Sequence, residues 1–182
     1  MIWSLSWRAD PVAKQIADRH YNRQNADAAQ FVPPGRCLVL RADAALWVTS
    51  WPIAEFVRHA WAGAWVCSAF RREDGLPASE MIRQAIAATR WRYGDPPALG
   101  MVTFLDRAQV RPVMVRGVPT WGRTWRLAGF KDAGETAGGL LALRLAPEDM
   151  PAPESPLGAT ADLFAAQVQR PALSERALVG AP

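Results

Sequence analysis

The chain has 182 residues, half of them hydrophobic, and a formal net charge of +4. This length suits one domain with its own core, and the apolar content excludes a wholly disordered chain. No run of eighteen apolar residues occurs, and the N-terminal MIWSLSWRADP lacks the basic and long apolar regions of a signal peptide. We therefore expect a soluble, cytoplasmic protein with no membrane partner.

The charge is unevenly distributed along the chain. Residues 148–182 carry a net charge of −3, which leaves +7 on residues 1–147. A basic body favours anionic partners such as nucleic acid or a phosphate-bearing cofactor. The nine tryptophans are many for this length, and we expect most of them in the core and some on a surface where bases or an adenine ring stack.

The N-terminal part of the chain predicts a strand, a helix and a hairpin. Asp10 and Pro11 form a typical helix start, because aspartate caps the first N–H groups and proline fits the first helical position. Cys37 and the later Cys67 lie in apolar runs, which favours buried, reduced thiols. The expected elements are a strand (2–7), a helix (11–20), a polar loop (24–30) followed by FVPPG, and two hairpin strands (37–41 and 45–50).

Residues 64–93 form the centre of the predicted fold. An apolar strand (64–70) leads into a turn that carries Arg71, Arg72 and Gly75. An amphipathic helix follows, because four apolar or small residues recur at the spacing of one helix face: Ile82, Ala85, Ile86 and Thr89. The segment 53–62 before the strand fits either a loop with helical turns or a lead into that strand.

The turn between this strand and this helix has the composition of an anion site. The first N–H groups of a helix lack internal partners, and the helix dipole adds positive charge there. Arg71 and Arg72 add charged donors, Gly75 permits close backbone approach, and Ser79 lies in the first turn. A pyrophosphate would fit, but an ordinary turn with two solvated arginines explains the same residues.

The remaining elements follow a break at Gly94-Asp95-Pro96-Pro97. We expect a strand (99–105), an exposed connection (107–119), a short helix (120–128) ended by Gly129, and a closing strand (140–145). Residues 148–182 are rich in proline, alanine and acids, and we expect a largely disordered tail with at most a short helix over 162–168. The folded domain is thus predicted to span residues 1–147.

Two segments resemble the GNAT acyltransferase superfamily. WRLAGFKDAGETAGGLLALRL (Trp125–Leu145) is similar to its closing helix, Gly-Phe turn and strand. Arg72-Glu73-Asp74-Gly75-Leu76-Pro77 looks like its pyrophosphate-binding loop. The resemblance implies an α/β fold with a central mixed β-sheet flanked by helices, in the order β, α, β, β, β, α, β, α, β, and an acyl-coenzyme A such as acetyl-CoA as donor.

The chain departs from that family at two positions. Pro77 stands where the loop normally has a small residue, which removes one N–H that would face the pyrophosphate. Trp125 stands where many members place the tyrosine that protonates the leaving thiolate, and an indole cannot act as that acid.

Within the superfamily, HYNR (His20–Arg23), the polar loop after it and FVPPG look like the phage Mom DNA-modification proteins. Mom-like proteins convert adenine in DNA to an acetamido derivative and so protect phage DNA from restriction. This resemblance implies DNA as the substrate, and the basic body and many aromatic residues agree with it.

The candidate site residues follow from the residues and the resemblance together. Four of them have a structural explanation as well: His20 as a helix-dipole partner, Ser68 as a plain strand serine, Asp106 as a turn residue and Arg123 as a solvated arginine. The candidate catalytic residues are His20, Tyr21, Arg23, Ser68 and Asp106. The candidate donor-binding residues are Val66, Cys67, Arg71, Arg72, Gly75, Ser79 and Arg123.

The sequence predicts a GNAT-like transferase that modifies a DNA base. Two alternatives stay open: an N-acetyltransferase acting on a small amine or a protein, and a catalytically inactive GNAT-like module that binds DNA or a partner protein. No metal-ligand spacing, nucleophile elbow or Walker motif is present, so a metal's participation is undetermined and a serine hydrolase has no support from the sequence.

Overall fold

The computed structural model describes residues 1–57 and 59–159, which form a mixed α+β structure built on one mostly antiparallel sheet. The strand order is β1-β2-β3-β4-β5-β9-β8, and only β4 and β5 run parallel. The strands are β1 (Ser4–Ser6), β2 (Arg36–Ala42), β3 (Ala45–Trp51), β4 (Trp65–Arg72), β5 (Met101–Leu105), β8 (Lys131–Glu135) and β9 (Leu141–Leu145).

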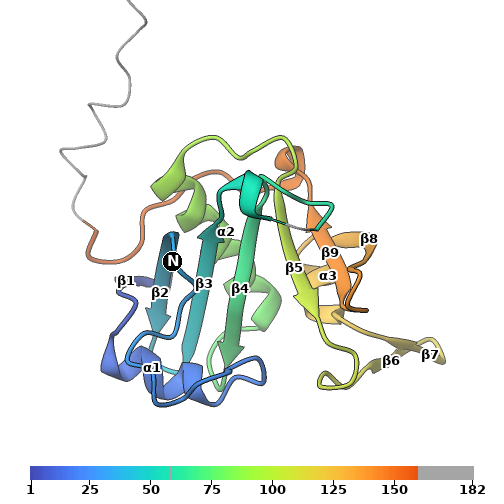
Figure 1. The fold of residues 1–182 in the computed structure, drawn as a ribbon, viewed down its shortest axis with the longest axis horizontal. Helices are drawn as coiled ribbons and strands as arrows, with labels where there is room; N and C mark the ends of the chain where they lie inside the picture. Colours follow the sequence, from blue (N-terminus) through green and yellow to red (C-terminus); the bar gives the residue numbers. More distant parts are fainter. Residues whose placement is uncertain (58, 160–182) are drawn as a thin grey trace, which may run out of the picture.

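Helices cover both faces of this sheet (Figure 1). Helix α1 (Pro11–Asp18) packs on one face, with Ile16 against Val39 and Val48. Helices α2 (Ala78–Tyr93) and α3 (Arg123–Leu127) pack on the other face with the larger cluster. Two short 3₁₀ turns, η1 (Ala54–Phe56) and η2 (Pro147–Asp149), complete the elements.

The core lies mainly between the sheet and α2. Strand side chains alternate between faces, so Leu38 and Leu40 point toward α2 whereas Val39 points toward α1. Five of the nine tryptophans are buried, as expected for most of them: Trp3, Trp47, Trp61, Trp65 and Trp125.

Several predicted elements are confirmed. Asp10 caps α1, since its Oδ1 accepts from the N–H groups of Val12 (2.9 Å) and Ala13 (3.3 Å). The apolar face predicted for α2 is buried, including Ile82 and Ile86, which are fully inaccessible. Cys67 is a buried free thiol, whereas Cys37 is only half-buried.

The connection predicted over 107–119 is exposed, but it contains two strands that the sequence did not predict. This segment and Thr120 form a separate two-stranded hairpin of β6 (Val113–Val115) and β7 (Val118–Thr120), which projects from the body (Figure 1). The short helix accordingly begins at Arg123 and not at 120. Strand β8 was not predicted, because its sequence KDAGE is polar and contains a glycine, as suits an edge strand. The ambiguous segment 53–62 contains only the turn η1 and loops among its described residues.

The predicted domain boundary at residue 147 is too early. Met150 is buried in the main cluster, and the Arg90 guanidinium donates to the Pro151 carbonyl at 2.8 Å. The Leu157 N–H donates to the Trp3 carbonyl at 2.7 Å. Residues 148–159 therefore pack along the body, because one methionine and a few backbone hydrogen bonds suffice to hold a proline-rich segment that composition alone assigns to a tail. The predicted helix over 162–168 lies outside the described residues.

None of the described helices is both long and apolar enough to cross a membrane.

Candidate functional site

The sheet opens between its two parallel strands. Strands β4 and β5 pair over only three positions, from Trp65↔Met101 to Cys67↔Thr103. The register between β3 and β4 also shifts here, since Val48 pairs with Ala69 and Thr49 with Cys67. Ser68 is thus a bulge residue, and bulges bend a strand and redirect its side chains. Beyond Cys67 the two strands diverge, and the divergence leaves room between them.

Three adjoining cavities fill this opening. A cavity of about 500 Å³ opens on the α1 face, one of about 190 Å³ lies between the strands, and one of about 260 Å³ opens on the α2 face. The central cavity shares Tyr21, Ser68 and Phe104 with the α1-side cavity. It shares Phe70, Leu105, Val110 and Trp125 with the α2-side cavity. The opening therefore gives access from both faces of the sheet.

The α2-side cavity is lined by three arginines and by no acidic residue. Arg72 comes from the end of β4, Arg111 from the segment before β6, and Arg123 from the start of α3. The Arg72 side chain donates to the carbonyls of Leu76 (2.8 Å) and Gly75 (3.2 Å), so it also holds the turn. Apolar side chains such as Phe70 and Trp125 form the inner wall. This cavity suits an anion attached to an apolar group.

The first turn of α2 adds backbone donors to the same side. Its N-cap is Pro77, and no side chain caps the helix. Within the described residues, the N–H groups of Ala78 and Ser79 have no hydrogen-bond partner. Ala78 lines the α2-side cavity, whereas Ser79 lines none of the described cavities. Gly75 adopts φ +100, a conformation that favours glycine, and so shapes the turn.

Arg71 lies on the opposite face from Arg72, because adjacent strand residues alternate. Its guanidinium donates to the Arg19 carbonyl at 2.5 Å and to Glu73 at 2.9 Å. Arg19 also binds Glu73, and these two arginines lower the pKa of the Glu73 carboxyl to about 2. Arg71 thus ties α1 to β4, and the structure does not bring the two adjacent arginines to one site.

His20 lies beside the central cavity, two residues after the end of α1. Its Nδ1 accepts from the Asn22 N–H at 3.3 Å, which places the proton of the neutral ring on Nε2. Burial lowers the pKa of the imidazole, and the nearby Arg71 charge acts in the same direction. The ring stacks on Tyr21, with centroids 4.6 Å apart. His20 is therefore a neutral ring that supports Tyr21.

The α1-side cavity forms one mouth of the opening, the α1-side mouth, and the α2-side cavity forms the other. Tyr21 and Asp106 both line the α1-side mouth. Burial raises the pKa of the Tyr21 phenol, and a hydrogen bond with the Asp106 backbone opposes that shift. The phenol therefore keeps its proton at neutral pH. Asp106 Oδ1 accepts from the Ala108 N–H at 2.8 Å, and the carboxylate reaches the cavity from the end of β5. The Tyr21 phenol, a proton donor, and the Asp106 carboxylate, a proton acceptor, thus line the same mouth.

Arg23 organises the polar loop. Its guanidinium donates to Asp18 (2.8 Å), to the Gln30 carbonyl (3.2 Å) and to the Ala28 carbonyl (2.8 Å). The side chain is only 11% exposed. Although Arg23 borders the α1-side cavity, its donors are used to fix the loop that forms the cavity wall.

The three β4 residues singled out from the sequence line the opening in different ways. Val66 and Cys67 line the α1-side cavity, and Cys67 also reaches the central one. Complete burial raises the pKa of the Cys67 thiol well above 9, so the thiol stays protonated. Ser68 bonds Ser50 (2.6 Å), and its carbonyl accepts from the Asn22 side chain at 2.9 Å, which joins the bulge to the HYNR segment.

Two residues of the opening were missed from the sequence. Asn22 bridges the polar loop and the bulge, and Arg111 lines the α2-side cavity. A signal for Arg111 existed, because residues 107–131 contain six basic side chains and no acid. The structure thus defines a mixed α+β protein whose sheet is open between β4 and β5, with a cationic mouth on one face and a polar mouth on the other.

Comparisons with protein-family models, with curated proteins and with solved structures found no match to this chain. Within the described residues, no cluster of three or more His, Cys, Asp or Glu side chains is arranged to hold a metal ion.

Proposed function

We propose that this protein is a GNAT-like transferase that modifies a base in DNA, adenine on the resemblance to Mom, with an acyl-coenzyme A type of donor. The observation that carries the proposal is the opening between β4 and β5, whose α2-side mouth has three arginines and no acid and whose α1-side mouth has Tyr21 and Asp106. The anionic diphosphate of the donor and an uncharged base would each enter by its own mouth, and the reacting groups would meet between the strands.

The element order supports the resemblance. The chain runs β1, α1, β2, β3, β4, α2, β5, α3 and a closing strand, with the β6–β7 hairpin and β8 added to the order expected from the superfamily. The turn after β4 leads directly into α2, at the position of the pyrophosphate loop that the resemblance implies.

The α2-side mouth fits the diphosphate of a coenzyme A. Arg111 and Arg123 would bind phosphate oxygens, together with the N–H groups of Ala78 and Ser79. Arg72 would hold the turn in place and present its remaining donor. When bound, the donor would supply an acyl group activated as a thioester.

The α1-side mouth fits a base extruded from DNA. The stacked rings of His20 and Tyr21 offer an aromatic surface, and such stacking is worth about 1–3 kcal/mol per base. The Asp106 carboxylate would accept a proton from an exocyclic amino group. Tyr21 Oη, whose raised pKa keeps it protonated, would give a proton to the leaving sulfur.

This assignment accounts for the two departures from the superfamily. Trp125 is buried and packs on Phe70 and Phe130, so it is part of the inner wall, and Tyr21 would take over the acid role from the other face. Pro77 removes its own N–H but leaves those of Ala78 and Ser79 for the ligand.

Mass spectrometry of nucleosides tests the proposal. Plasmid DNA would be isolated after co-expression with the wild-type chain, with Arg111→Gln/Arg123→Gln, and with Arg92→Gln, whose arginine is exposed on α2 away from the opening. We expect a new nucleoside mass with the wild type and with Arg92→Gln, and its loss in the double variant. An unchanged nucleoside profile from a folded wild-type protein would refute it.

The same protein distinguishes the alternatives. Release of free thiol from acetyl-coenzyme A with an amine and without DNA would identify an N-acetyltransferase. Coenzyme A binding without turnover of any substrate would identify an inactive binding module.

A further inference from the structure

The β6–β7 hairpin lies in the most basic segment of the chain. Residues 107–131 contain five arginines and one lysine and no acid. Three of these six side chains are neutralised by acids from β8 and η2: Arg107 by Glu135, Arg126 by Asp132 and Lys131 by Asp149. Arg111, Arg116 and Arg123 enter no ion pair or side-chain hydrogen bond formed within residues 1–57 and 59–159. An excess of positive charge therefore remains along the hairpin.

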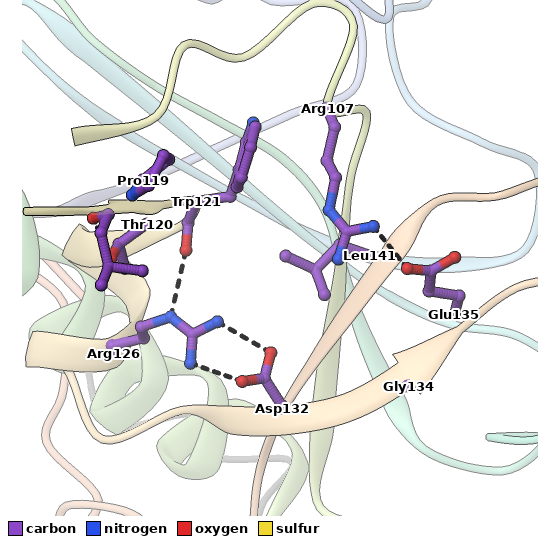
Figure 2. Close-up of a pocket in the computed structure, with 10 residues that line it drawn as sticks. Arg107, Pro119, Thr120, Trp121, Arg126, Asp132, Gly134, Glu135 and Leu141 are labelled. Carbon is purple, nitrogen blue, oxygen red and sulfur yellow. Dashed lines mark hydrogen bonds and ion pairs between the residues drawn. The ribbon is translucent and has the colours of Figure 1, made fainter. Parts of the chain in front are cut away.

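The ion pairs hold the base of the hairpin in place. Figure 2 shows the Arg126 guanidinium bonded to both carboxylate oxygens of Asp132, at 2.8 Å each, and to the Trp121 carbonyl. The same view shows Arg107 bonded to Glu135. The Trp121 indole donates to the Val110 carbonyl at 3.0 Å, which joins the two ends of the hairpin. The β6–β7 hairpin, a two-stranded ribbon, thus projects from a base that these contacts hold in place.

The tip of the hairpin carries an arginine in an unfavourable conformation. Arg116 has φ 51 and Gly117 has φ 81, so both residues of this two-residue turn have positive φ. Such turns favour asparagine before glycine, and Arg116 is the only non-glycine residue with positive φ among those described. The arginine does not benefit the turn itself, and its charge is placed at the outermost point of the ribbon.

The two strands expose apolar side chains to solvent. Met114 and Val118 are each 61% exposed and Val113 is 50% exposed. Pairing of another strand along the β7 edge is hindered, because Pro119 has no N–H at the pair next to the closing Val115–Val118 pair, where that group would point outward. Duplex nucleic acid is a partner that attracts positive charge and admits apolar side chains against its bases, and it binds without pairing to a β-strand.

We propose that the β6–β7 hairpin enters a groove of duplex DNA, with Arg116 contacting phosphates at the tip and the exposed Met114 and Pro119, which share one face of the hairpin, packing against the bases. The inference rests on the proposed function for its choice of DNA as partner. Asp106 and Gln109, in the segment between β5 and β6, line the α1-side cavity, so the ribbon begins beside the mouth proposed for the base. A groove bound there keeps the duplex beside the site, and apolar insertion lowers the cost of extruding the base.

Fluorescence anisotropy with a labelled duplex tests the inference in the full chain. Arg116→Asn removes the charge and places a residue that the turn favours, so it keeps the fold. We expect its Kd for duplex to rise about three- to tenfold and the slope of log K against log salt to fall by about 0.9. Arg92→Gln serves as the matched loss of a charge elsewhere and is expected to bind as the wild type. Met114→Gln, which keeps the side-chain length, is expected to weaken duplex binding with no change in the salt slope.

Equal Kd and salt slope for wild type and Arg116→Asn would overturn the inference, as would a wild type without affinity for duplex. A dimer that Met114→Gln dissociates, seen by sedimentation without duplex binding, would assign the hairpin to self-association and also overturn it. The two proposals fail separately. If Arg116→Asn binds duplex more weakly but the wild type produces no modified nucleoside, the inference about the hairpin stands and DNA modification is refuted. If Arg116→Asn modifies DNA and binds duplex like the wild type, only the inference about the hairpin is refuted.

Discussion

The two mouths of the β4–β5 opening differ in the way they treat their charged side chains. On the α1 side, Arg23 and Arg71 are bonded to the chain itself, and their donors fix α1, the polar loop and β4 to one another. On the α2 side, Arg111 and Arg123 have no partner within the described residues, and no acid lines the cavity. Arginines that hold the fold together and arginines without a partner among the described residues thus occur within one site.

This difference distinguishes a mouth whose arginines hold the fold in place from a mouth whose arginines have no partner within the described residues. The α1-side mouth is rigid and polar, with a protonated phenol, a neutral imidazole and a carboxylate. The α2-side mouth is cationic, with uncapped N–H groups at the start of α2. If the two mouths serve two reactants, substitutions in one should leave the other reactant's binding unchanged. The following predictions test that separation, from the largest expected effect to the smallest.

Replacing Tyr21 with phenylalanine should have the largest effect. Tyr21→Phe keeps the ring stacked on His20 but removes the proton donor, and we expect about a hundredfold loss in the rate of DNA modification with the Kd for coenzyme A unchanged. The purified protein's rate and calorimetric binding would be measured together. Tyr93→Phe is the control, because Tyr93 is the other of the two tyrosines and packs against Trp51 and Trp65 away from the opening. Full activity of Tyr21→Phe would exclude the acid role.

Removing one arginine of the α2-side mouth should have a smaller effect, limited to the binding of coenzyme A. We expect Arg123→Gln to raise the Kd for coenzyme A about tenfold, the size expected for one lost hydrogen bond to a charged group. Calorimetric titration with coenzyme A measures it, with Arg92→Gln as the matched control. If both variants bind coenzyme A like the wild type, the α2-side mouth does not hold the diphosphate.

A change in the turn before α2 should affect stability more than binding. A Cβ on Gly75 would meet no atom within 4 Å, so Gly75→Ala adds only backbone strain at φ +100, about 1 kcal/mol. Gly122→Ala should cost more, because its Cβ would lie 2.5 Å from Leu143 and 2.7 Å from Leu105. Urea unfolding compares the two variants, and an equal loss of stability in both would contradict this account.

The smallest effect concerns the titration of His20. Burial lowers the pKa of this imidazole below 6.5, so the folded protein disfavours its protonation. Its contribution leaves stability unchanged above pH 6.5 and reduces it as the pH falls from there through the lowered folded pKa. An NMR titration of the ring protons, with His59→Gln to separate the two histidines, should give a His20 midpoint below 6.5. A midpoint above 6.5 would show that the folded protein favours the protonated ring, contrary to this account.

The sequence alone determined the elements whose signals are local. The cap at Asp10, the strand before Arg71 and the helix face of Ile82 and Ile86 follow from spacing of a few residues, and all three lie in the structure as expected. The order of the central strands and helices followed from the same patterns. The resemblance to the GNAT superfamily and to Mom stays a hypothesis, which the predictions above examine.

Only the tertiary structure decided which of these residues meet. The bulge at Ser68 arises from pairing with β3, and a strand's own sequence does not specify where its partner's register shifts. Strand alternation then sends Arg71 to α1 and Arg72 to α2, although they are adjacent in sequence. Arg111 reaches the same cavity from the segment before the β6–β7 hairpin, and the residues that flank this hairpin, Arg107 and Arg126, form ion pairs with β8. Local propensity fixes each segment, but long-range pairing fixes which side chains share a site.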